Sequence, residues 1–140
     1  MIRIALVSAG LALGLTTVLA QSDPIAERKT VMKAVGGATG LGAKIAKGEE
    51  AFDAAKVQGI FKTYADAAKK MPGLYPASSK TGGETTAAPK VWEDEAAFKA
   101  AFVKFEADAN AGATVTDLAG FRTAFGRDRT SRAAQAFAFD

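Results

Sequence analysis

Apolar residues recur at helical spacing along most of this chain, and the pattern is most regular between residues 91 and 110. Phe98, Phe102 and Phe105 follow the spacing i, i+4, i+7, which places their side chains on one face of an α-helix. Looser patterns of the same kind occupy three other segments: 23–47, 49–71 and residue 115 onward. Each helix must bury its apolar face, so the sequence predicts an all-α chain folded as an antiparallel four-helix bundle.

Residues that favour helix ends and turns separate the four segments. Asp23 suits an N-cap, and Pro24 suits the first position of a helix, where no backbone N–H is needed. Residues 72–90 hold three of the four prolines and several glycines, and this stretch is too long for a tight turn. We therefore expect one long connection between the second and third helices. Thr114 or Thr116 is expected to cap the fourth helix.

Four glycines interrupt the apolar pattern of the first predicted helix: Gly36, Gly37, Gly40 and Gly42. Each glycine costs up to about 1 kcal/mol relative to alanine inside a helix. One interpretation is a weak or broken helix. The other is a helix face on which a backbone or a cofactor approaches closely.

The first 20 residues have the pattern of a secretory signal peptide. Arg3 supplies a positive charge, an apolar stretch follows, and the segment ends in Val18-Leu19-Ala20. The alternative is a membrane anchor, but about 20 residues are needed to span the apolar core of a bilayer. We predict cleavage after Ala20, export to the periplasm and no membrane attachment afterwards. The remaining segment, 21–140, forms the bundle domain.

The composition excludes several kinds of chemistry. The 140 residues include no cysteine and no histidine, so disulfides, thiolate metal sites, thiol catalysis and histidine-based acid–base catalysis are absent. The formal net charge of +3 is not concentrated in a basic block, so no binding of nucleic acid is expected. No nucleophile–base pair is recognisable, and we predict that the protein is not an enzyme.

Two blocks of sequence resemble the class II c-type cytochromes, the cytochrome c-prime family. The first block contains Ile25, Arg28, Met32 and Gly36. The second block, GETTAAPKVWED at residues 83–94, reproduces a family pattern through six positions: Gly83, Thr85, Ala87, Pro89, Val91 and Trp92. The second block is the more specific, and it lies at the right distance from the first.

The resemblance implies a periplasmic four-helix bundle that carries one covalently attached haem c and serves in electron transfer or in binding small gases. In such proteins the fourth helix carries C-x-x-C-H, whose histidine is the proximal iron ligand. By resemblance alone, Arg28 matches an arginine near a haem propionate, and Met32 matches the distal position, where a methionine can bind iron. The family also suggests a redox partner protein and a homodimer.

The sequence departs from this family near its C-terminus. At the usual offset the motif falls on Arg132, Gln135 and Ala136, so the chain as printed cannot attach haem covalently. Residues 127–140 form an atypical tail that is rich in arginine and alanine. A frameshift in the coding DNA would produce such a tail; a genuine haem-free descendant is the other explanation. The alternative function is a haem-free helical bundle that acts as a structural or partner-binding module.

Overall fold

The computed structural model describes the backbone of residues 23–139 and the side chains of residues 23–129. Within this part of the chain the secondary structure is entirely helical. The elements in chain order are α1 (Pro24–Lys47), α2 (Ala54–Lys70), η1 (Met71–Leu74), η2 (Ala77–Ser79), α3 (Lys90–Glu93), α4 (Glu95–Gly112) and α5 (Leu118–Phe139). The predicted signal peptide at residues 1–20 lies outside the described residues.

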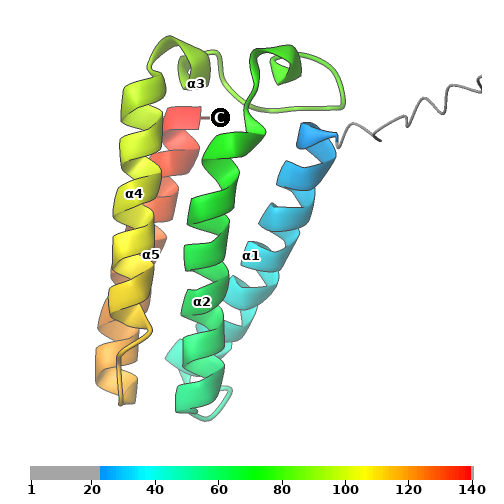
Figure 1. Ribbon diagram of the computed structural model, residues 1–140. Coiled ribbons are helices and arrows are strands. Elements are labelled where there is room, and N and C mark those ends of the chain that lie inside the picture. Colours follow the sequence, from blue (N-terminus) through cyan, green and yellow to red (C-terminus); the bar gives the residue numbers. More distant parts are fainter. Residues whose placement is uncertain (1–22, 140) are drawn as a thin grey trace, which may run out of the picture.

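The four long helices form an antiparallel bundle, as predicted. Figure 1 shows the short α1–α2 and α4–α5 links at one end and the long connection at the other. The helix α2 packs against both α1 and α4, and α4 packs against α5. The helix α1 diverges from α2 toward its own N-terminus, beside the long connection (Figure 1). None of the described helices is long and apolar enough to cross a membrane.

The helix α1 begins and ends where the sequence predicts. The Asp23 side chain accepts a hydrogen bond from the backbone N–H of Ile25 at 2.9 Å, and Gly48 closes the helix in the left-handed conformation with φ 82°. The helix is continuous, so the expectation of a broken helix is wrong. A close approach occurs at Gly42, where a Cβ atom would overlap the Phe125 ring, whereas Gly36 has nothing within 4 Å of that position.

The helix α2 begins at Ala54, five residues later than predicted. The Asp53 side chain caps it by accepting a hydrogen bond from the Lys56 backbone N–H at 2.7 Å. Glu49 and Glu50 lie before this cap, and their backbone N–H groups donate to the Lys44 carbonyl at the end of α1. The prediction of a helix from residue 49 is wrong because these residues satisfy carbonyls of the preceding helix.

The predicted third helix is divided at Asp94. Its first turn is α3, and Asp94 then caps α4 by accepting a hydrogen bond from the Ala97 backbone N–H at 3.1 Å. The start of α5 also differs from the prediction. Neither Thr114 nor Thr116 caps this helix; instead the Asp117 side chain accepts a hydrogen bond from the Gly120 backbone N–H at 2.7 Å.

Aromatic side chains fill the centre of the bundle. Phe61 and Tyr64 of α2 are fully buried, and their ring centroids lie 6.0 Å apart. The Tyr64 ring lies 5.9 Å from that of Phe105 in α4, and the Phe61 ring lies 6.0 Å from that of Phe121 in α5. These contacts join three helices, and the cluster continues through Phe125 at 5.2 Å from Phe121. Burial of these large aromatic rings contributes most of the stability of the bundle core.

Candidate functional site

Arg28, one of the two residues predicted for a cofactor site, is buried between α1 and the long connection. Only 6% of its surface is exposed, and its guanidinium lies 4.2 Å from the centre of the Tyr75 ring. Its Nη2 donates to the Ser79 carbonyl at 3.1 Å, and its Nη1 donates to the Thr85 hydroxyl at 3.3 Å. This cation therefore joins the first turns of α1 to residues more than 50 positions later in the chain.

The contacts of the second sequence block, residues 83–94, explain why these residue types occur at these positions. Gly83 has a positive φ of 55°, and a Cβ atom there would lie 3.1 Å from the Ile25 side chain. The Thr85 hydroxyl also accepts the Ala87 backbone N–H at 3.2 Å. The Trp92 indole N–H donates to the Tyr75 carbonyl at 2.9 Å. The block thus holds the long connection against the N-terminal end of α1.

Met32, the other predicted residue, lies one turn after Arg28 on α1. Its side chain is 53% exposed, so it is not part of the aromatic core. A thioether in this position is accessible from outside the bundle. The roles of Arg28 toward a propionate and of Met32 toward iron remain predictions.

The ligands available in this chain do not fit a covalently attached haem. The sequence has no cysteine for a thioether bond and no histidine for the proximal position. Residues 132, 135 and 136, where the family motif would fall, lie within α5, and their side chains are outside the described residues. Met71 is 5% exposed and is part of the core. In the described part of the chain, no group of three or more acidic, histidine or cysteine side chains could hold a metal ion.

Sequence reasoning missed the residues that surround Arg28. Tyr75 and Ser79 lie in the proline- and glycine-rich connection, where no periodic pattern distinguishes buried side chains from exposed ones. Ser79 is 3% exposed although it is polar. The bulky aromatic character of Tyr75 within a polar stretch was the one available signal.

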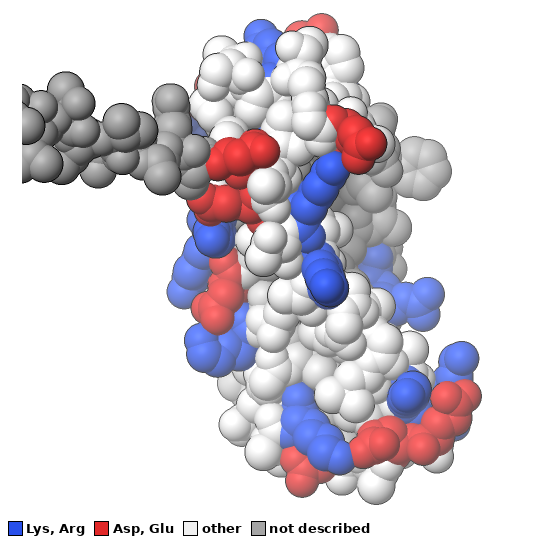
Figure 2. All heavy atoms as spheres, turned by 90° about the vertical axis from the view of Figure 1, so that its right-hand side faces the viewer, with Lys and Arg blue, Asp and Glu red and all other residues white. Residues whose placement is uncertain are grey.

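Charged side chains of both signs alternate on the face of the molecule that includes α1. Figure 2 shows lysines and arginines next to acidic residues, with an uncharged area between the groups. Near the α1–α2 link, Lys56 donates a hydrogen bond to the Glu50 carboxylate, and this bond together with the lysine charge lowers the pKa of Glu50 from its ordinary value. This face shows no continuous basic patch (Figure 2).

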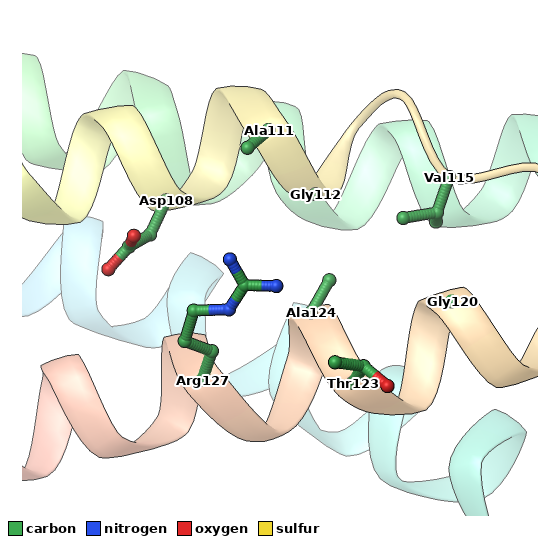
Figure 3. A pocket seen from close by; sticks show the side chains of 8 residues that line it. All are labelled: Asp108, Ala111, Gly112, Val115, Gly120, Thr123, Ala124 and Arg127. Carbon is green, nitrogen blue, oxygen red and sulfur yellow. The ribbon is translucent and has the colours of Figure 1, made fainter.

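A separate cavity of about 270 Å³ lies between α4 and α5, near the link that joins them. Its α4 wall includes Asp108 and Ala111, and its α5 wall includes Thr123, Ala124 and Arg127. Figure 3 shows the Arg127 guanidinium extending from α5 toward α4, between Asp108 and Ala124. The cavity is lined by residues from the C-terminal half of α4, the α4–α5 link and the N-terminal half of α5. This link lies at the opposite end of the bundle from the long connection (Figure 1).

Comparisons with known proteins agree with the resemblance that the sequence suggested. Residues 23–131 match the family model described as cytochrome C'. A cytochrome c' of Rhodopseudomonas palustris is 44% identical over 126 residues, which are 89% of this chain and 86% of that protein. A cytochrome c-556 of Agrobacterium fabrum is 41% identical over 102 residues, which are 71% of this chain and 68% of that protein.

Solved structures give the same result for the fold. The structure of cytochrome c' from Rhodopseudomonas palustris superposes with a TM-score of 0.81 at 42% identity, covering 85% of this chain and 96% of that chain. The structure of cytochrome c' from Rubrivivax gelatinosus superposes with a TM-score of 0.74 at 28% identity, covering 84% of this chain and 94% of that chain. These relatives are named as cytochromes, so the comparisons give no support to a haem-free structural module.

Proposed function

Because this chain belongs to the cytochrome c' family, we propose that its bundle is the framework of a periplasmic haem protein that transfers electrons or binds a small gas. The observation that carries this proposal is the match over residues 23–131, which includes both sequence blocks around Arg28 and Trp92. When bound, haem would supply the redox-active iron and the site for a gas ligand. The protein part would supply the enclosing helices and no enzymatic step.

The C-terminal part of the printed sequence is the obstacle to this function. Residues 132, 135 and 136 hold Arg, Gln and Ala where the family motif requires two cysteines and a histidine. A frameshift downstream of Gly126 would explain why the motif is missing from these positions. The coding DNA tests this directly, because another reading frame should then encode C-x-x-C-H. A search of all frames that finds no such motif would favour a genuine haem-free descendant.

Restoring the motif tests whether this framework is built for haem. We expect the printed chain, produced with the cytochrome maturation machinery, to carry no covalent haem. The triple variant Arg132→Cys, Gln135→Cys, Ala136→His should acquire haem whose Soret absorbance survives acid–acetone extraction. The double variant Arg132→Cys, Gln135→Cys is the matched control, since it supplies the thiols without the proximal ligand.

Two results would contradict the proposal. The printed chain could retain an acid-stable Soret band, which would mean that haem attaches without cysteine. Alternatively, the triple variant could show full helical circular dichroism yet bind no haem, covalently or otherwise. In that case the bundle is not a haem framework despite its fold.

Export and association belong to the same proposal. The pattern of residues 1–20 supports cleavage after Ala20, so the N-terminus of the exported protein should begin at Gln21. A redox partner and a homodimer are expected from the family. Sedimentation analysis of the purified exported protein measures the dimer directly, and a monomer at all concentrations would exclude it.

A further inference from the structure

The cavity between α4 and α5 combines an apolar wall with one cation directed into it. Ala111 and Ala124 contribute methyl groups from the two helices, and Val115 closes the side toward the link. Across this wall lies the Arg127 guanidinium, which extends into the space in Figure 3. An arginine presents a planar fork of N–H donors that matches a carboxylate in shape and charge.

One cation, Arg127, and one acid, Asp108, line the cavity. The Asp108 carboxylate is paired with Lys104 at 2.6 Å. Within the described part of the chain, the Arg127 guanidinium forms neither a hydrogen bond nor an ion pair. The N–H donors of the Arg127 fork are therefore available to a singly charged anion such as a carboxylate.

The volume limits the size of the ligand. The cavity measures about 270 Å³, whereas an apolar cavity of about 150 Å³ in another protein accepts benzene. There is therefore room for one ring or a short aliphatic chain together with a carboxylate. The Thr123 hydroxyl donates its only proton to the Ala119 carbonyl at 3.1 Å. It can still accept a hydrogen bond, but it cannot donate one to an anion in the cavity.

We propose that this α4–α5 cavity binds a small monocarboxylate with an apolar body, of the size of benzoate, and that Arg127 holds its carboxylate. The apolar part would lie against Ala111, Val115 and Ala124. Neither Arg28 nor Met32, the residues predicted for the haem site, lines this cavity. With so few atoms, such a ligand is expected to bind with a Kd on the order of 1 mM.

Titration with benzoate, followed by heteronuclear NMR of the purified full chain, tests the proposal. We expect saturable shifts of the backbone amides of Ala111, Gly112 and Ala124. The neutral isostere benzamide should bind at least about tenfold more weakly, and Arg127→Gln should weaken benzoate by a similar factor. Asp108→Asn should leave benzoate binding intact or strengthen it, because it removes a like charge.

Arg129→Gln is the matched control, since Arg129 is an exposed arginine on the same helix that does not line the cavity. It should leave the Kd for benzoate unchanged. The proposal fails if the shifts do not saturate, if benzamide binds as well as benzoate, or if the two arginine variants weaken binding equally. A helical circular dichroism spectrum for each variant ensures that lost binding is not lost folding.

Discussion

At the scale of single residues, Arg28 is the best example of a side chain whose role follows from its partners. A buried guanidinium is stable only when its donors are satisfied, and here they reach a carbonyl, a hydroxyl and the face of a tyrosine ring. Ser79 is almost fully buried, so its carbonyl depends on this donor. The arginine thus contributes to stability by fixing the long connection.

Replacing Arg28 should therefore destabilise the fold more than replacing its neighbour. We expect Arg28→Met to lower the free energy of unfolding by about 2–3 kcal/mol, because it leaves the Ser79 carbonyl without its donor and removes the cation from the Tyr75 ring. Lys29→Met is the control: Lys29 makes only exposed contacts, an ion pair with Glu84 and a hydrogen bond to the Gly83 carbonyl, and its loss should cost no more than about 0.5 kcal/mol. Urea denaturation measures both; equal losses would show that the Arg28 contacts contribute little.

At the scale of elements, α1 is a helix in which glycines have different roles. Gly42 faces α5, and a methyl group there would overlap the Phe125 ring, which is 3% exposed and confined by its neighbours. Gly36 is exposed and has nothing within 4 Å of a Cβ position. The same substitution should therefore have opposite effects at these two sites.

We expect Gly42→Ala to destabilise the protein by about 1–3 kcal/mol through overpacking. Gly36→Ala should stabilise it by about 0.5–1 kcal/mol, because alanine loses less backbone entropy than glycine in a helix. The midpoint of thermal unfolding, followed by circular dichroism at 222 nm, should fall for the first variant and rise for the second. A change of the same sign in both would contradict the packing of α1 on α5.

The elements also show which parts of the fold the sequence determines locally. The ends of α1 were predictable because an Asp N-cap and a left-handed Gly act through their own backbone neighbourhood. The start of α2 was missed although Asp53 caps it by the same local mechanism. The reason is that Phe52 fits the helical spacing yet packs on Phe121 from outside the helix, with ring centroids 6.5 Å apart. That contact depends on α5, which is distant in the sequence.

The candidate site could likewise be predicted only in part. Helical spacing placed Arg28 and Met32 one turn apart on α1, and the structure agrees. Their very different exposure could not be predicted, because Arg28 is covered by the connection and Met32 is not. The connection has no periodicity from which its path over the end of the bundle could be inferred.

At the scale of the whole molecule, burial is concentrated in the aromatic cluster that joins α2, α4 and α5. Phe61, Tyr64 and Phe121 have no exposed surface, whereas residues 80–84 of the connection are exposed. We therefore expect hydrogen exchange to be slowest in the middle of α2 and α4 and fastest around Gly82. Native-state exchange followed by mass spectrometry measures this gradient. Uniformly fast exchange with strong binding of a hydrophobic dye would instead identify a molten bundle.

The position of Trp92 gives the molecule a built-in optical reporter. It is the only tryptophan in the chain, and its indole ring lies beside Tyr75, with its N–H bonded to the Tyr75 carbonyl and the Lys80 ammonium 5.7 Å from its ring. Its fluorescence should therefore follow release of the connection rather than melting of the helices. A red-shifted emission in Arg28→Met with unchanged ellipticity would show that the connection is released while the helices stay folded.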